Sequence, residues 1–240
     1  MTPLETPCTL RSEILGNERS IWIRDPAPDS PALDLLVLLD AELYRNRVQA
    51  PQIIETLFES GHLKNLLVVY VSCVDMDTRW TECPCHPPFA EFVSKELIPW
   101  IHARHPRTRK AKERVIAGLS YTGLAASFTA LTHDGLFSKV ISQSGSYWSN
   151  DCWLTKEFDG KKQKHPPAFF LDVGDRETQE YVWHKEGVIQ TLSQIEGVRR
   201  FHDMLSKNGY SVRYDTYSGG HSAEAWATSL PNALKWAFST

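Results

Sequence analysis

An α/β protein with a mostly parallel central sheet, covered by helices on both faces, is the fold class that this 240-residue sequence predicts. Short apolar runs alternate along the chain with segments of helical periodicity, which is the pattern of successive strand and helix units. Several runs are apolar almost throughout, as expected of strands buried on both faces. The length suits a single domain over residues 1–240, and no shift in composition indicates a second one.

The apolar runs locate the expected strands. The first alternates between apolar and polar residues, and most of the others are largely apolar. The expected strands cover residues 20–24, 33–39, 66–71, 115–117, 139–142, 168–173 and 210–217. The helices expected between them have apolar residues at helical spacing. They cover residues 53–59, 89–101, 124–131, 198–205 and a C-terminal segment that ends near residue 238. Residues 25–31, 72–88 and 149–166 are expected to be loops, because they are rich in proline or in polar side chains.

Composition argues against several classes of protein. A net charge of −3 argues against a nucleic-acid partner, and no apolar run approaches the roughly 18 residues of a membrane span. The N-terminus lacks a basic segment followed by an apolar stretch, and the five cysteines show no framework spacing, so we expect a cytoplasmic protein with reduced thiols. Cys83-Pro84-Cys85 has only His86 nearby, whereas a structural zinc site uses about four ligands, so neither a metal nor another cofactor is expected.

Residues 113–131 have the layout of a nucleophile elbow, which is a strand, a strained turn carrying a serine, and a helix. A serine hydroxyl is a weak nucleophile, so it must project from a tight turn toward a base. Gly118 leaves room where a side chain would collide with the following turn. Ser120 is therefore the candidate nucleophile. Thr122 replaces the last glycine of G-x-S-x-G, and a motif this short is also compatible with a plain turn between a strand and a helix.

His221 is the candidate base. It follows the last expected strand in the glycine-rich turn Ser218-Gly219-Gly220-His221. Because the functional sites of parallel sheets lie beyond the carboxyl ends of the strands, this turn could bring His221 against Ser120. The chain order of nucleophile, acid and histidine is that of the α/β-hydrolases, and the sequence therefore predicts this fold.

The sequence leaves two candidates for the acid that would pair with His221. Asp172 lies within the expected strand 168–173, whereas Asp175 and Glu177 both fall in the loop after it, where the acid of an α/β-hydrolase belongs. Either residue could orient the imidazole and stabilise its charged form. Either could instead cap the following helix.

Two backbone N–H groups are expected to bind the oxyanion that develops during acyl transfer. One is the N–H of Tyr121, immediately after the nucleophile. The other should come from the loop after an earlier strand. The segment Asp40-Ala41-Glu42 follows the strand 33–39, and the Glu42 N–H is the donor predicted there.

Motifs at several strand ends resemble one known family. The sequence is similar to the esterases of the esterase D group, and most closely to the catalytic domain of the enterochelin (enterobactin) esterases, over about residues 10–238. Besides the elbow, the resemblance rests on Leu38-Leu39-Asp40-Ala41, Asp77-Thr78-Arg79 with Glu82, Ser142-Gln143-Ser144-Gly145-Ser146-Tyr147-Trp148, Val173-Gly174-Asp175-Arg176-Glu177 and Gly219-Gly220-His221. Ala41 and Thr122 stand where the family has glycines, and His86 where an asparagine is expected.

The resemblance implies a function and several site roles. Family members cleave the ester bonds of cyclic or linear catecholate siderophores so that cells can release iron, which implies a serine esterase acting through an acyl-enzyme. The acid of the family looks to sit three residues after the glycine, which favours Glu177 over Asp175. Arg79 would contact the substrate and Trp148 would line its pocket. The sequence looks like the shorter trilactone hydrolases, which lack the separate N-terminal domain of larger enterochelin esterases.

A ferric tris-catecholate is trianionic and aromatic, and an arginine offers it both charge and stacking. Further aromatic candidates near strand ends are Trp80, Trp153 and Trp183. Two other interpretations remain: an esterase or acyltransferase of the same group that acts on another small ester, since one fold hosts many chemistries, and a catalytically inactive binder of a similar ligand. The presence of Ser120, Glu177 and His221 argues against the inactive binder.

Overall fold

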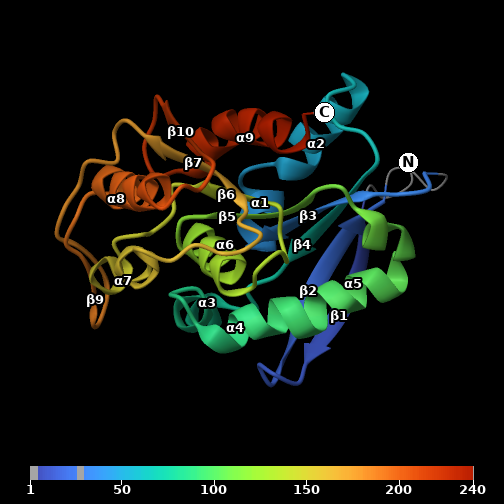
Figure 1. Cartoon of the computed structure of the whole chain (residues 1–240), viewed down its shortest axis with the longest axis horizontal. Coiled ribbons are helices and arrows are strands. Elements are labelled where there is room, and N and C mark those ends of the chain that lie inside the picture. The colour runs from blue at the N-terminus through green and yellow to red at the C-terminus, as the bar shows by residue number, and fades with distance from the viewer. Residues whose placement is uncertain (1–4, 26–29, 240) are drawn as a thin grey trace.

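The computed structural model describes residues 5–25 and 30–239 and confirms the predicted α/β fold (Figure 1). Within these residues, eight strands form one sheet in the order β1-β2-β4-β3-β5-β6-β7-β10, and β8 and β9 form a separate hairpin. The strands of the main sheet are parallel from β4 to β10, whereas β1 pairs antiparallel with β2, and β2 with β4. Part of the loop expected at residues 25–31 lies outside the described residues.

The strands are β1 (Thr6–Ser12), β2 (Asn17–Arg24), β3 (Asp34–Leu39), β4 (Leu66–Val71), β5 (Arg114–Leu119), β6 (Lys139–Gln143), β7 (Ala168–Gly174), β8 (Val182–Lys185), β9 (Val188–Gln190) and β10 (Val212–Tyr217). The helices are α1 (Ala41–Asn46), α2 (Ala50–Glu59), α3 (Met76–Glu82), α4 (Pro87–Phe92), α5 (Ile98–Arg104), α6 (Tyr121–Thr132), α7 (Ser149–Phe158), α8 (Gln194–Lys207) and α9 (Ala223–Phe238). A π-helical turn (Val93–Leu97) joins α4 to α5, and a 3₁₀ turn (Pro106–Lys110) follows α5.

The core consists of two apolar layers, one on each face of the sheet. Helices α1, α2 and α9 cover one face, and α4, α5, α6 and α8 cover the other (Figure 1). Alternate residues of β3 enter the two layers: Leu35 and Val37 face one, and Leu36 and Leu38 face the other. A strand packed on both sides needs apolar residues at every position, which explains the continuous apolar runs of the sequence.

Two sequence expectations were wrong. The segments 72–88 and 149–166, expected to be loops, contain α3 and α7. Helix α3 turns Arg79 and Glu82 inward, and both are buried through ion pairs with Asp40 and Arg19, so the helix has no apolar stripe to detect. The helix expected over 89–101 is confirmed as the continuous helical segment of α4, the π-helical turn and α5; the π-turn precedes Pro99, which lacks the N–H that would continue α-helical bonding.

Strand β1 and the β8–β9 hairpin were not anticipated from the sequence. Both are short and partly exposed, and the hairpin has only one buried residue, Gln190. Their residues therefore carry little of the apolar signal that marks a strand. Among the described residues, no helix combines the length and the apolar character needed to cross a bilayer.

Candidate active site

Ser120 occupies the turn between β5 and α6, in the middle of the sheet. Its backbone has φ 53° and ψ −123°, a conformation that non-glycine residues rarely adopt. The turn is tight: a Cβ atom at Gly118 would lie 2.1 Å from the carbonyl oxygen of Thr122. The strained turn projects the serine side chain beyond the carboxyl end of β5, as the elbow motif predicts.

Thr122 and Gly123 explain the departure from the usual elbow motif. The Thr122 hydroxyl donates to the carbonyl of Leu119 at 2.8 Å and accepts from the Leu119 N–H at 3.0 Å, so it ties the turn together. Gly123 is the position that must be small, because a Cβ atom there would lie 2.6 Å from the Ser142 hydroxyl oxygen. The required glycine is therefore one residue later than in G-x-S-x-G. It lies at the point where α6 packs against Ser142 of β6.

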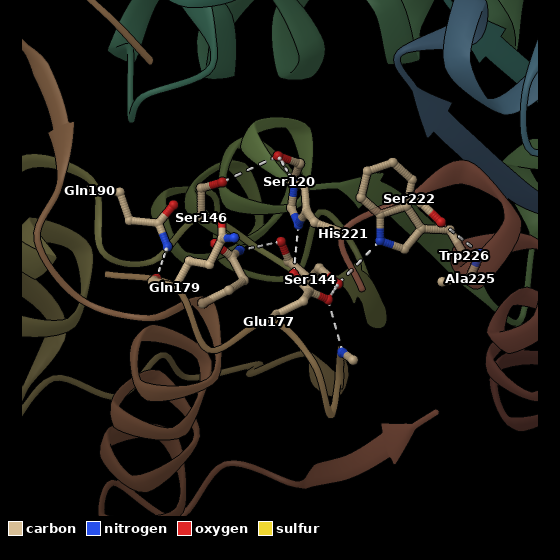
Figure 2. Close-up of polar contacts among 12 residues, drawn as sticks. Ser120, Ser144, Ser146, Glu177, Gln179, Gln190, His221, Ser222, Ala225 and Trp226 are labelled. Atoms are coloured by element: carbon tan, nitrogen blue, oxygen red, sulfur yellow. Dashed lines mark hydrogen bonds and ion pairs between the residues drawn. The ribbon is translucent and has the colours of Figure 1, made fainter. Parts of the chain in front are cut away.

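Ser120, His221 and Glu177 form a chain of hydrogen bonds (Figure 2). The Ser120 Oγ lies 2.9 Å from Nε2 of His221, and Nδ1 of His221 lies 2.6 Å from Oε2 of Glu177. The three residues follow β5, β10 and β7, which are distant in sequence. Asp175 lies elsewhere: its carboxylate accepts a hydrogen bond from the Gly219 N–H at 2.9 Å, which fixes the loop that carries His221.

Glu177 is buried and fully hydrogen-bonded. Its Oε1 accepts from the Ser144 hydroxyl at 2.7 Å, the Gly174 N–H at 2.8 Å and the Tyr217 hydroxyl at 3.1 Å. Burial raises the pKa of Glu177, but the hydrogen bond and charge of His221, together with the bonds from Ser144 and Gly174, lower it by more. The net pKa lies below the ordinary value, so this carboxylate is ionised at neutral pH.

Trp226 contacts both His221 and Ser144, the residue whose hydroxyl donates to Glu177. Its ring meets the imidazole of His221 edge to face at 4.8 Å, and its Nε1 donates to the Ser144 hydroxyl at 3.1 Å (Figure 2). Sequence reasoning identified no role for Ser144, Tyr217 or Trp226. Ser144 belongs to the motif of residues 142–148 that carries the family resemblance, and this motif was the one sequence feature that could have indicated its role. Tyr217 and Trp226 had none, because their neighbours come from other elements.

A cavity of about 530 Å³ opens at Ser120. Its wall includes four aromatic rings in a closed cycle. Trp80 lies 4.8 Å from Tyr121, Tyr121 lies 5.5 Å from Trp148, Trp148 stacks on His184 at 5.0 Å, and His184 lies 5.9 Å from Trp80, all measured between ring centroids. The wall therefore suits a flat aromatic group.

His184 comes from the β8–β9 hairpin, which completes this wall. Its Nε2 lies 3.1 Å from the Gln190 side-chain oxygen, and the Gln190 amide donates to the carbonyl of Gln179 at 3.3 Å. Lys185 places its Nζ 5.7 Å from the ring centroid of Trp80. Trp153 and Trp183 are 40% and 63% exposed and are absent from the cavity lining, so the structure does not place these two candidates in the wall.

Arg79 and Trp148 both line the cavity, although each already has a polar partner. The Arg79 Nε donates to the Asp40 carboxylate at 2.7 Å, and both side chains are buried. Burial raises the pKa of Asp40 and Arg79 partly offsets this rise. The Trp148 Nε1 donates to the Gln194 side-chain oxygen at 2.7 Å, and its ring is stacked on His184.

The two predicted oxyanion donors lie at the starts of two different helices, α6 and α1. Tyr121 is the first residue of α6 and lines the cavity beside Ser120. Glu42 lies in the first turn of α1, after Asp40, whose backbone is left-handed at φ 69°. The first N–H groups of a helix have no intrahelical acceptor. The Glu42 side chain is exposed and accepts from the Cys73 N–H at 3.3 Å.

The potential metal ligands are already engaged. Among the described residues, Asp40, Glu42 and Cys73 are the group of three whose ligand atoms lie within 4.8 Å of one another. The Arg79 guanidinium binds the Asp40 carboxylate and takes the place of a cation there. Cys83 and Cys85 belong to no such group, and all five cysteines are free thiols.

A mostly parallel sheet, a serine on an elbow, and a carboxylate and histidine from later strand ends define an α/β-hydrolase. The chain matches the model of the family described as "Putative esterase" over residues 12–237. It belongs to this esterase family, in agreement with the predicted class of carboxylic ester hydrolases.

Two of the curated relatives are iron(III) enterobactin esterases. The one from Dickeya dadantii is 27% identical over 237 residues, and the one from Escherichia coli K12 is 28% identical over 226 residues. These alignments cover 94% and 93% of this chain but 53% and 54% of the relatives, so the chain spans about half their length. The uncharacterized protein YbbA of Bacillus subtilis is 22% identical, with 93% of both chains covered.

Solved structures of similar fold include the enterochelin esterase of Shigella flexneri, with a TM-score of 0.85 and 25% identity over 99% of this chain and 59% of that one. The siderophore hydrolase EstB of Aspergillus nidulans has a TM-score of 0.73 and 16% identity, with coverage of 98% and 94%, which shows a shared fold alone. The relatives confirm the family resemblance predicted from the strand-end motifs.

Proposed function

We propose that this chain is a serine esterase that hydrolyses the ester bonds of an enterobactin-like catecholate siderophore. The observation that carries the proposal is the hydrogen-bonded chain of Ser120, His221 and Glu177 at the elbow of an esterase-family fold. The names of the relatives support the substrate, since several are iron(III) enterobactin esterases. The proposal treats residues 1–240 as one catalytic domain, supported by the single main sheet.

In the first half-reaction, Glu177 holds the proton of His221 on Nδ1, so that Nε2 can accept the proton of Ser120. The Ser120 Oγ attacks the ester carbonyl as it loses this proton. The N–H groups of Tyr121 and Glu42 bind the resulting oxyanion, and each such donor supplies about 3 kcal/mol of transition-state stabilisation. The oxyanion then collapses, the bond between the acyl carbon and the alkoxy oxygen of the ester breaks, and His221 protonates the leaving alcohol, so that the acyl group remains on Ser120.

In the second half-reaction, His221 removes a proton from a water molecule that attacks the acyl-enzyme. Collapse of this intermediate breaks the bond between the acyl carbon and the Ser120 Oγ. The electron pair stays on Oγ, which recovers its proton from His221. The lowered pKa of Glu177 keeps a negative charge beside the imidazolium during both half-reactions.

The cavity suits an anionic aromatic substrate. The four-ring wall offers flat apolar surface, and Arg176 lines the same cavity with a side chain that is 73% exposed. Among the cavity-lining residues the carboxylate is that of Glu177, which is engaged with His221. Arg79, expected to contact the substrate, is held by the buried Asp40 carboxylate at 2.7 Å. Arg176 has only an exposed pair with Asp175 at 3.8 Å, so it is the more available cation for an anionic group.

A hydrolysis panel tests the proposal. The purified protein and Ser120→Ala are incubated with iron-loaded and iron-free catecholate trilactones and with a p-nitrophenyl ester, and products are separated by chromatography. We expect cleavage of the trilactones by the wild type and loss of nearly all turnover in Ser120→Ala, with unchanged circular dichroism. Cleavage of the p-nitrophenyl ester alone would indicate a different small ester as substrate. Binding of a trilactone without any cleavage would indicate an inactive binder.

The five free thiols support a reducing compartment, and the proposal therefore places the reaction in the cytoplasm.

A further inference from the structure

A second serine lies beside the nucleophile and has no part in the mechanism above. The Oγ of Ser146 is 3.3 Å from the Oγ of Ser120, which also contacts His221 (Figure 2). Ser146 lines the catalytic cavity, yet the residue is only 1% exposed. Its hydroxyl is therefore directed at the reacting oxygen rather than at bulk solvent.

The loop after β6 holds Ser146 in place. The Ser146 N–H donates to the carbonyl of Ser120 at 3.1 Å, and the Ser146 carbonyl accepts from the Ser149 N–H at 3.0 Å. The preceding residue, Gly145, is packed so closely that a Cβ atom would lie 2.4 Å from the Ser142 hydroxyl oxygen. Ser146 thus contacts the nucleophile through both its backbone and its side chain, and the position of its hydroxyl is fixed before substrate binds.

The direction of the hydrogen bond between the two serines follows from the rest of the chain. Glu177 is ionised and can only accept, so Nδ1 of His221 carries the imidazole proton. In neutral His221, Nε2 is then an acceptor, and the one proton of the Ser120 hydroxyl points at it. Toward Ser146, the Ser120 Oγ can therefore only accept, and Ser146 donates.

We propose that Ser146 is a further catalytic residue, whose hydroxyl donates to the reacting oxygen of Ser120. This inference rests on the proposed esterase function. In the free enzyme the donated bond holds the Ser120 proton toward His221. In deacylation the bond between the acyl carbon and Oγ breaks, and negative charge develops on Oγ before His221 returns the proton. The Ser146 hydroxyl stabilises this charge, because hydrogen bonds to ionised acceptors are stronger than neutral ones.

The kinetic test uses Ser146→Ala with Ser149→Ala as the matched control. Ser149 is a buried hydroxyl of the same segment, and its side chain contacts the Tyr121 hydroxyl at 3.4 Å. On a p-nitrophenyl ester, we expect Ser146→Ala to lower kcat about tenfold, equal to about 1.4 kcal/mol, with KM within about twofold of wild type. Ser146→Thr, which keeps a hydroxyl, should recover most of the loss. Ser149→Ala should change kcat by less than about twofold.

Labelling of Ser120 by an alkyl fluorophosphonate, followed by mass spectrometry, separates this inference from the proposed function. If wild-type Ser120 is not labelled, the esterase proposal fails. If it is labelled, we expect Ser146→Ala to react about tenfold more slowly and Ser149→Ala at the wild-type rate. Equal labelling rates and equal kcat in wild type and Ser146→Ala would overturn the role of Ser146. A loss in kcat that comes with a raised KM and a lowered Tm would also overturn it, because it would show a structural effect.

Discussion

Asp175 and Glu177 lie two residues apart after β7, and their side chains reach different partners. Glu177 binds the imidazole of His221, and Asp175 binds the Gly219 N–H. We therefore expect Glu177→Gln to lower kcat at least about a hundredfold with little change in KM, since the acid holds the histidine tautomer and stabilises the imidazolium. Asp175→Asn should cost far less.

Steady-state kinetics of both variants on one ester, with folding checked by circular dichroism, decide the assignment. A large loss in Asp175→Asn and a small one in Glu177→Gln would reverse it. Small losses in both would mean that Ser120 and His221 act without a carboxylate.

The buried ion pair of Arg79 decides how the effect of substituting this residue should be interpreted. Its ion pair with Asp40 is buried on both sides. Arg79→Met leaves the Asp40 carboxylate buried without a partner, so we expect the free energy of unfolding to fall by about 3–5 kcal/mol. Adding Asp40→Asn should restore much of this loss, because the unpaired charge is removed.

Urea unfolding of wild type, the single variant and the double variant measures this coupling. An unfolding free energy that is unchanged in Arg79→Met would contradict the buried pair, and would make any loss of activity a direct effect on substrate binding.

At the scale of single elements, the elbow depends on a close backbone contact. A Cβ atom at Gly118 would lie 2.1 Å from the backbone oxygen of Thr122, which cannot move without disturbing the start of α6. We expect Gly118→Ala to destabilise the fold by about 1–3 kcal/mol or more and to displace Ser120. Gly220→Ala is the matched control, because no heavy atom lies within 4 Å of its added Cβ. Equal Tm values for the two variants would count against this account of the turn.

The β8–β9 hairpin is the element that supplies His184 to the aromatic wall. Removing one ring from a cluster of this kind costs about 0.5–1.5 kcal/mol of ring–ring interaction. We therefore expect His184→Ala to raise KM for an ester with an aromatic acyl group several-fold, and to leave KM for an acetyl ester nearly unchanged. Trp183→Ala provides the control, since this neighbouring ring is 63% exposed and lies outside the cavity lining. Equal effects of His184→Ala on both esters would argue against a role in recognising the acyl group.

At the scale of the whole molecule, Asp172 makes folding stability depend on pH. It is fully buried in β7, opposite Asp215 of β10, and its Oδ2 has no hydrogen-bond partner. Burial raises its pKa to about 8, against about 3.9 in an unfolded chain. Between these values the folded state retains a proton that the unfolded state has released. This residue therefore lowers the stability as pH rises, by up to about 1.4 kcal/mol per pH unit.

Asp172→Asn removes this titration while keeping an oxygen for the Ser144 N–H. We expect the variant to gain stability relative to wild type from pH 5 to pH 8, as measured by urea unfolding at each pH. A stability difference that stays constant over this range would show that Asp172 is ionised in the folded protein.

Much of the fold could be predicted from the sequence, because buried strands and amphipathic helices have characteristic patterns of apolar residues. Strands β3, β4 and β7 are buried on both faces and are largely apolar, so their positions are visible in the sequence. Helix α3 was missed because it buries Arg79 and Glu82 through ion pairs, and a helix of this kind has no apolar stripe. The β8–β9 hairpin was missed because its residues are mostly exposed, with Gln190 the one buried position among its strands.

The sequence by itself determined the α/β fold class and the positions of Ser120 and His221 at strand ends, because these depend on periodicity and chain order. The esterase family was indicated by resemblance of the strand-end motifs. Only the tertiary structure decided which carboxylate faces His221, since two residues of one loop can point in different directions. It also decided that Arg79 is paired with Asp40 and that Ser146 lies against Ser120. These contacts join residues that are 26 to 39 positions apart, and such distances are fixed by how strands and helices pack, which no local pattern records.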